Sequence, residues 1–273
     1  MERVEMGKIG LIALDLDGTL LDPAGRIRPD SKQAIAQAKE AGVEVLLATG
    51  RAAPEAAWFA QEAGCGILAA ALGGAVMCDA RTGKHLRRWD FPLEVGRKAL
   101  SLCLNRGIDL MIFAGEAIVL DPWSKKRLLQ YYPFPCFHDH TVVTEDPLAY
   151  VEEHGLPITK IHGDGDPAAY PLQELSALEG VTLTASSDRD FELVPAKVGK
   201  GRTLALMALL RGVPLERCAA VGDSPNDLSM LEVVGSPIAM GNASAQVKAA
   251  ARYVTGDNGC GGVAQAIRWC LRQ

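Results

Sequence analysis

Two short apolar runs, one near each end of the chain, stop at an aspartate. Ile9–Leu14 is followed by Asp15, and Arg217–Val221 is followed by Gly222 and Asp223. Runs this short fit a buried parallel strand and are too short for a core helix. In open α/β sheets, ligands bind in the crevice beyond the carboxyl ends of the strands, so acids at these ends are candidates for chemistry.

Strand and helix patterns alternate in two separate parts of the chain. In the first part, a helical pattern over Ser31–Ala41 separates Ile9–Leu14 from a second strand candidate, Val43–Ala48. From Phe191 onward the alternation resumes, with a helical pattern over Arg202–Arg211 ahead of the second aspartate-ended run. Such alternation is typical of βαβ units.

Between these parts the pattern changes to short strand candidates, with most of the histidines. The chain has 273 residues, which favours two domains. We therefore expect an α/β fold with a doubly wound, Rossmann-like parallel-sheet core built from residues 1–80 and 187–273. Residues 81–186 are expected to form an inserted α+β domain.

Composition excludes some classes of partner. The chain has 28 Lys plus Arg against 33 Asp plus Glu, a net charge of -5, which gives no electrostatic footprint for nucleic acid. Its seven cysteines include no C-x-x-C pair, a usage typical of reduced cytosolic thiols. No segment reaches the roughly 18 uninterrupted apolar residues of a membrane span. We expect a cytoplasmic protein that binds neither nucleic acid nor membrane.

The first aspartate has a second acid two residues away. A carboxylate such as Asp15 can attack a phosphoryl group and form an aspartyl-phosphate. Asp17 lies on the same face of an extended backbone, where it can give a proton to the leaving group and later take one from water. Gly18 lets the chain turn sharply after it. Alone, this D-x-D pattern is equally compatible with a surface turn or a calcium loop.

The second aspartate begins the run Gly222-Asp223-Ser224-Pro225-Asn226-Asp227. Carboxylates from two strand ends suit Mg²⁺, which takes one or two carboxylates together with water and phosphate. We expect Asp223 to bind the metal directly. Asn226 and Asp227 are expected to orient metal-bound water or a lysine. An ordinary helix N-cap is the alternative explanation for this run.

Two further segments offer groups that bind phosphate. Thr49 ends an apolar strand candidate, and Gly50-Arg51 opens a helix whose free backbone N–H groups form an anion site. Lys200 lies just before a helix and supplies a cation that can pair with the phosphate and with Asp15. A lysine just before a helix is usually a solvated surface charge. Here, however, the aspartates expected nearby would repel one another without a cation such as Lys200.

Together these motifs resemble those of the haloacid dehalogenase (HAD) superfamily, specifically the Cof-type phosphatases. The resemblance rests on the order and spacing of four runs: DLDGTLLD at 15–22, TGR at 49–51, KG at 200–201 and GDSPND at 222–227. It extends to Phe191-Glu192-Leu193 and to AMGNA at 239–243. The resemblance implies that the inserted domain is a cap that closes over the substrate and determines its specificity.

The resemblance also implies a role for each site residue. Asp15 is the expected nucleophile and Asp17 the acid/base, and Thr49 and Lys200 are expected to bind the substrate phosphate. Mg²⁺ is expected to bind the Asp15 carboxylate, the Asp17 backbone carbonyl and Asp223. The expected activity is hydrolysis of a small phosphate monoester, such as a sugar phosphate.

One departure from the family and two alternatives bear on this expectation. Relatives commonly carry Asn-Gly-Ala where this chain has Gly73-Gly74-Ala75, so a side-chain amide near the substrate is missing. A phosphomutase or phosphotransferase would use the same motifs. A non-enzymatic receiver domain also places an aspartate, a magnesium site, a threonine and a lysine on a parallel sheet, but it has no use for Asp17.

Overall fold

The computed structural model describes residues 8–128, 135–185 and 187–273. The chain divides into two compact units. Unit 1 holds the chain up to Arg87 and from Gly199 onward, and unit 2 holds Arg88–Val198. None of the helices in the described part of the chain has the length and hydropathy of a membrane-spanning segment.

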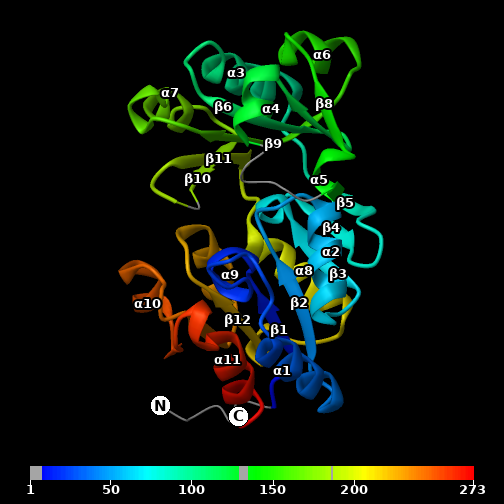
Figure 1. Ribbon diagram of the computed structural model, residues 1–273, viewed down its shortest axis with the longest axis vertical. Coiled ribbons are helices and arrows are strands. Elements are labelled where there is room, and N and C mark those ends of the chain that lie inside the picture. Colours follow the sequence, from blue (N-terminus) through cyan, green and yellow to red (C-terminus); the bar gives the residue numbers. More distant parts are fainter. Residues whose placement is uncertain (1–7, 129–134, 186) are drawn as a thin grey trace. The chain divides into compact units, whose positions relative to one another are not determined.

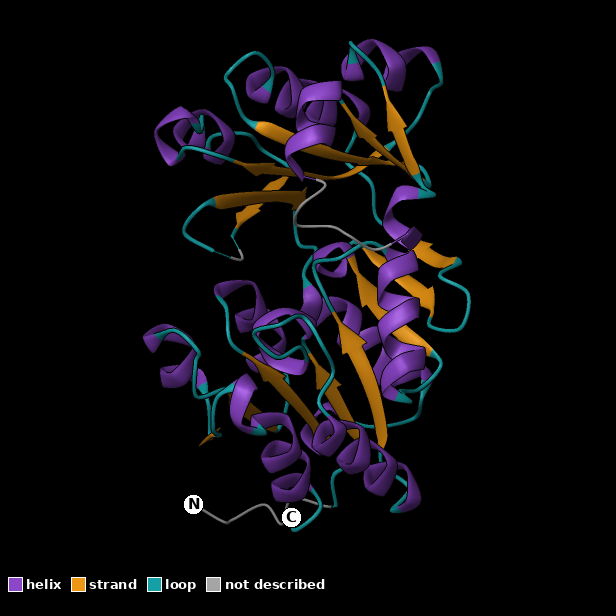
Figure 2. Ribbon diagram, viewed as in Figure 1, coloured by secondary structure: helices purple, strands orange, loops and turns teal. Residues whose placement is uncertain are grey.

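Unit 1 is built on one sheet of eight strands (Figures 1 and 2). In spatial order the strands are β14 (Tyr253–Val254), β13 (Ser236–Ala239), β12 (Cys218–Gly222), β1 (Leu11–Leu14), β2 (Glu44–Ala48), β3 (Leu68–Ala71), β4 (Val76–Asp79) and β5 (His85–Arg88). The pairs from β14 to β3 are parallel, and β3 pairs antiparallel with β4. The predicted parallel-sheet core is therefore confirmed.

Helices cover both faces of this sheet. They are α1 (Pro29–Glu40), α2 (Ala53–Ala63), α8 (Lys200–Leu210), α9 (Leu228–Leu231), α10 (Ala245–Ala250) and α11 (Gly262–Cys270). α1 packs against α2 and α11, and α8 packs against α9. Both α2 and α8 contact β3, with α2 in front of it and α8 behind it in Figure 1. The sheet is thus doubly wound, as predicted.

The strand order explains why distant sequence motifs meet. β1 is central, with β2 on one side and β12 on the other, and Leu14 is level with Leu47 and Val221 in the two ladders. The chain leaves all three strands at the same edge of the sheet because all three are parallel. Successive connections turn to opposite sides at β1, which is the type of switch point where α/β proteins bind ligands.

Unit 2 has its own sheet of six mainly antiparallel strands. In spatial order they are β10 (Val181–Thr184), β11 (Asp190–Pro195), β9 (Ile158–Asp164), β6 (Asp109–Ala114), β7 (Ala117–Leu120) and β8 (Thr141–Val143). The helices are α3 (Leu93–Cys103), α4 (Pro122–Leu128), α5 (Pro135–His138), α6 (Pro147–Glu153) and α7 (Leu172–Ser176). Apolar residues of β6, β9 and β11 join α3 in a buried core. Unit 2 is thus an α+β insertion.

The predicted cap range and unit 2 differ at both ends. The predicted range, 81–186, contains β5, which pairs in the sheet of unit 1, and omits β11, which pairs with β9 in unit 2. Residues 129–134 and 186 of that range lie outside the described residues. The predicted range differs from unit 2 because β5 pairs within the sheet of unit 1, whereas β11 pairs within the sheet of unit 2.

Candidate active site

The loop after β1 is held in a tight turn against the loop after β12. Gly18 has φ +79°, and a Cβ there would lie 2.3 Å from Oδ2 of Asp223, so only glycine fits this backbone. The turn brings Thr19 back toward the same residue, and the Thr19 hydroxyl donates a 2.8 Å hydrogen bond to Asp223 Oδ1. The sequence Asp-Gly-Thr thus joins two strand ends.

Lys200 lies at the centre of a buried group of charges. Its ammonium is 2.6 Å from Asp15 Oδ1, 2.6 Å from Asp227 Oδ1 and 3.0 Å from Asn226 Oδ1. The exposed fractions are only 1% for Lys200, 4% for Asp15 and 0% for Asp227. Such charge-assisted hydrogen bonds are strong where water is excluded. The first residue of α8 is therefore fixed to the ends of β1 and β12.

Asp227 acts as an internal tie within its own loop. Its Oδ2 accepts hydrogen bonds from the backbone N–H of Asp223 at 2.8 Å and of Ser224 at 3.0 Å. Gly222 permits this approach, because a Cβ there would lie 2.5 Å from Asp227 Cγ. Both oxygens of Asp227 are thus engaged in orienting Lys200 and the loop.

Two carboxylate oxygens of the group have no such partner. Among the residues that the structure describes, no donor contacts Oδ2 of Asp15 or Oδ2 of Asp223. Ligand atoms from Asp15, Asp223 and Asp227 all lie within 4.8 Å of one another. Asp15 and Asp223 therefore offer free oxygens to a ligand, whereas Asp227 does not.

The electrostatics of the group follow from burial. Burial, and then the charge of Asp227, raise the pKa of Asp15 well above its usual value, although Lys200 opposes the shift. The same two causes raise the pKa of Asp223 to about 6. Burial alone would lower the pKa of Lys200, but the charges of Asp15 and Asp227 outweigh it and raise this pKa. The site thus favours additional positive charge.

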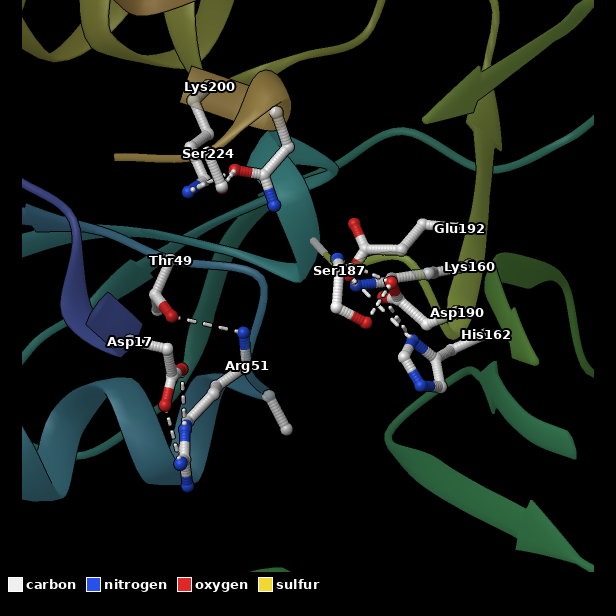
Figure 3. Close-up of polar contacts among 12 residues, drawn as sticks. Asp17, Thr49, Arg51, Lys160, His162, Ser187, Asp190, Glu192, Lys200 and Ser224 are labelled. Atoms are coloured by element: carbon white, nitrogen blue, oxygen red, sulfur yellow. Dashed lines mark hydrogen bonds and ion pairs between the residues drawn. The ribbon is translucent and has the colours of Figure 1, made fainter. Parts of the chain in front are cut away.

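A second group of polar residues follows β2. The Thr49 hydroxyl is buried and accepts a 3.1 Å hydrogen bond from the backbone N–H of Arg51. The Arg51 guanidinium donates to both oxygens of Asp17, at 2.8 and 2.9 Å (Figure 3). It also donates to Glu55 at 2.8 Å. The Asp17 carboxylate therefore points toward the start of α2.

Two asparagines brace the loop after β1 from the other side. Asn242 donates a 2.8 Å hydrogen bond to the carbonyl oxygen of Gly18, and its own Oδ1 accepts from the backbone N–H of Asn258 at 2.9 Å. Asn258 in turn donates to the carbonyl oxygen of Leu21 at 2.7 Å. The turn that carries Asp17 is thus held at two carbonyl groups.

The structure brings most of the predicted site residues together in two sets. Lys200 contacts three of them directly, and Thr19 links Asp223 to the loop of Asp15 and Asp17. The sequence interpretation assigned no role to Thr19, Glu55 or Asn258. A signal was present for Thr19, which follows the D-x-D-G run, but a pairing such as Arg51 with Glu55 depends on side-chain conformation.

Comparisons with known proteins agree with this geometry. Residues 12–267 match the sequence profile of the haloacid dehalogenase-like hydrolase family. The 5-amino-6-(5-phospho-D-ribitylamino)uracil phosphatase YwtE of Bacillus subtilis is 30% identical, over 94% of this chain and 96% of that protein. The pyridoxal phosphate phosphatase YbhA of Escherichia coli is 27% identical, over 94% and 97%.

A solved structure gives the same result. A haloacid dehalogenase-like hydrolase from B. subtilis superposes with a TM-score of 0.85 at 28% identity, covering 95% of this chain and 99% of that one. The chain therefore belongs to the haloacid dehalogenase-like hydrolases, and within them to the Cof type. It is a phosphatase.

Proposed function

We propose that the protein is a Mg²⁺-dependent phosphatase that hydrolyses a small soluble phosphate monoester through a phosphorylated Asp15. The observation that carries this proposal is the buried Lys200 ammonium, held 2.6 Å from the carboxylates of Asp15 and Asp227. It supports a site that holds a nucleophilic carboxylate in place and supplies a cation to an incoming phosphate.

The charge of the site supports a divalent metal. Asp15, Asp223 and Asp227 carry three negative charges when ionised, and Lys200 is the one cation among the described residues that contacts them. Oxygen donors with two unsatisfied negative charges fit Mg²⁺. Asp15 and Asp223 would hold it through their carboxylates, and Asp17 through its backbone carbonyl. Bound there, Mg²⁺ would neutralise charge on the transferring phosphoryl group.

In the first half of the proposed reaction, an Asp15 oxygen attacks phosphorus. The new O–P bond forms as the bond to the leaving oxygen breaks, and Asp17 gives that oxygen a proton. Lys200 and the Thr49 hydroxyl, whose proton remains available for donation, bind the phosphate oxygens. The backbone N–H of Gly50, near the start of α2, is proposed to contribute to the same anion site.

In the second half, water attacks the phosphorus of phospho-Asp15 and gives a proton to Asp17. The bond between phosphorus and Asp15 breaks, which regenerates the carboxylate and releases inorganic phosphate. Asn226 and Asp227 keep Lys200 oriented through both halves. Asp17 thus returns to the protonated form that the next cycle needs.

We propose a sugar phosphate or a similar metabolite as the substrate. The names of the relatives support a small ester, because one acts on a phosphorylated ribitylaminouracil and another on pyridoxal phosphate. Unit 2 is proposed to be the cap that determines specificity. Transfer to a sugar hydroxyl instead of water is the remaining alternative, whereas the phosphatase assignment rules out a receiver domain.

The test compares hydrolysis of p-nitrophenyl phosphate by the wild type, Asp15→Asn and Asp17→Asn, with Mg²⁺ and with EDTA. We expect loss of activity in EDTA and in both variants. Acid-quenched protein should carry acid-stable, base-labile phosphate in the wild type and in Asp17→Asn but not in Asp15→Asn. Asp139→Asn, which removes an exposed carboxylate in unit 2, serves as the matched control and should keep full activity.

Two results would count against the proposal. Equal turnover by the wild type and Asp15→Asn would end the assignment of the nucleophile. Appearance of phosphate on an added sugar, in place of inorganic phosphate, would favour a transferase. A panel of phosphate esters then identifies the preferred substrate.

A further inference from the structure

Arg51 makes an unusual set of contacts at the edge of the site. Its Nε and Nη2 donate to the two oxygens of Asp17 at 2.9 and 2.8 Å, while Nη1 donates to Glu55 at 2.8 Å. The guanidinium also lies over the ring of Phe59, 5.4 Å from its centroid. Contacts with Asp17, Glu55 and the Phe59 ring together fix the orientation of the planar guanidinium.

The buried carboxylate of Glu55 accepts hydrogen bonds through both of its oxygens. It is 1% exposed, and its second oxygen accepts a hydrogen bond from the backbone N–H of Ala52, just ahead of α2. A buried carboxylate is strongly destabilising without a partner, and Arg51 is that partner. Glu55 is therefore attached to the rigid helix and holds Arg51 in place.

Asp17, by contrast, lacks packing that would fix its side chain. Its side chain is 53% exposed, and Arg51 is the one hydrogen-bonding partner of its carboxylate among the described residues. In Figure 3 this carboxylate points toward Arg51 and away from Lys200. The conformation of Asp17 thus depends on Arg51, and through it on Glu55.

We propose that Arg51 is the positioning residue for the acid/base Asp17, and that Glu55 sets the orientation of Arg51. This inference rests on the proposed function, in which Asp17 exchanges protons with the leaving oxygen and with water. The bidentate pair confines the Asp17 side chain to one narrow range of conformations beside the site. Loss of that restraint costs proton transfer, whereas binding of phosphate by Lys200 and Thr49 continues.

The test uses two substrates that differ in their need for a general acid. p-Nitrophenolate leaves with little help from a proton, whereas an alkoxide leaving from an alkyl phosphate needs one. For Arg51→Met we expect kcat/KM to fall about 30-fold for glucose 6-phosphate or another alkyl ester that the wild type hydrolyses. For p-nitrophenyl phosphate we expect a fall of about threefold or less.

Two further variants complete the series. Glu55→Gln keeps the size of the side chain but loses the charge, and its single acceptor oxygen can keep only one of the two hydrogen bonds, from Arg51 or from Ala52. We therefore expect an intermediate fall of about fivefold with the alkyl ester alone. Arg51→Lys, which keeps the charge but not the planar fork, should recover part of the loss. Arg81→Met is the matched control, because Arg81 makes the same bidentate pair with Asp79 at an exposed turn. It should leave both substrates unaffected.

The outcomes distinguish the inference from the proposed function. Equal falls for both substrates, or no fall for either, in folded Arg51→Met or Glu55→Gln would overturn the role of Arg51. Folding is checked by the thermal transition, and if Arg51→Met does not fold, Arg51→Lys and Glu55→Gln carry the comparison. Absence of any Mg²⁺-dependent turnover in the wild type would instead contradict the proposed function.

Discussion

The Thr19 hydroxyl donates a 2.8 Å hydrogen bond to Oδ1 of Asp223, a residue 204 positions further along the chain. The bond connects the loop after β1 to the loop after β12. It leaves Oδ2 of Asp223 as the oxygen that faces the proposed metal. A hydroxyl with no catalytic role of its own thus determines which oxygen of Asp223 is available.

Replacement of Thr19 by valine tests this connection. Thr19→Val keeps the shape of the side chain but removes the donor, so Asp223 loses its orienting partner. We expect the Mg²⁺ concentration for half-maximal activity to rise about tenfold, and the free energy of unfolding to fall by about 1–2 kcal/mol. Calorimetric titration with Mg²⁺ gives the affinity directly.

A matched substitution isolates this effect. Thr141→Val removes a similar hydroxyl bond to the carbonyl oxygen of Phe137 in unit 2. This variant is expected to leave the Mg²⁺ affinity unchanged. An unchanged affinity in Thr19→Val would show that the hydroxyl has no part in orienting Asp223.

Loss of the central ammonium should affect stability as well as activity. Lys200→Met leaves the buried carboxylates of Asp15 and Asp227 without their cation, and breaking such pairs costs about 3–5 kcal/mol. We expect no measurable turnover, and a melting temperature that recovers toward the wild-type value at acidic pH, where the carboxylates are protonated. A variant as stable as the wild type at pH 8 would contradict this account.

Asp223 gives the metal-free protein a distinct pH dependence. Its pKa is raised from 3.8 to about 6, first by burial and then by the charge of Asp227. Between these values the folded state holds a proton that the unfolded state has lost. Stability therefore falls as pH rises from about 4 to about 6 and stays lower above that range.

Thermal unfolding in EDTA measures this contribution. The melting temperature of the wild type, relative to that of Asp223→Asn, is expected to decline across the same pH range, by the equivalent of about 2–3 kcal/mol. Protection of the wild type by Mg²⁺ should increase over that range, because the metal binds the ionised carboxylate. Parallel curves for the two proteins would argue against the raised pKa.

Gly73 offers a test of substrate preference. It has φ +66°, in the left-handed region where asparagine is the best tolerated side chain after glycine. Gly73→Asn introduces the residue that the resemblance to Cof-type phosphatases leads us to expect here, and its φ is one that asparagine tolerates. Kinetics across a panel of phosphate esters should show changed KM values. Identical KM values for every ester would show that this position does not contact the substrate.

The parallel core was predictable because its strands are buried on both faces and are therefore continuously apolar. Ile9–Leu14 and Arg217–Val221 were predicted as strands, and the structure has Leu11–Leu14 and Cys218–Gly222. The acid that follows each run is visible in the sequence as well. The motifs therefore fix the strand ends without any knowledge of the contacts between them.

Side-chain pairing across the site was less predictable. Arg51 and Asp17 are 34 positions apart, and only their conformations in the fold show that both Asp17 oxygens are engaged. Asparagine is a common turn residue, so the sequence around Asn242 does not reveal that its side chain donates to the carbonyl oxygen of Gly18. The ends of unit 2 depend on strand pairing, which the pattern within β5 or β11 does not reveal.

The position of β1 between β2 and β12 has a consequence for biosynthesis. The ribosome delivers β1 and β2 early, but β12 follows only after the whole of unit 2 has been made. Until then one edge of β1 has no strand to pair with, and Asp15 has neither Lys200 nor Asp227 beside it. Unit 2 can fold as a separate unit during this interval. The nascent enzyme is therefore expected to acquire its active site only after unit 2 and β12 have both been made.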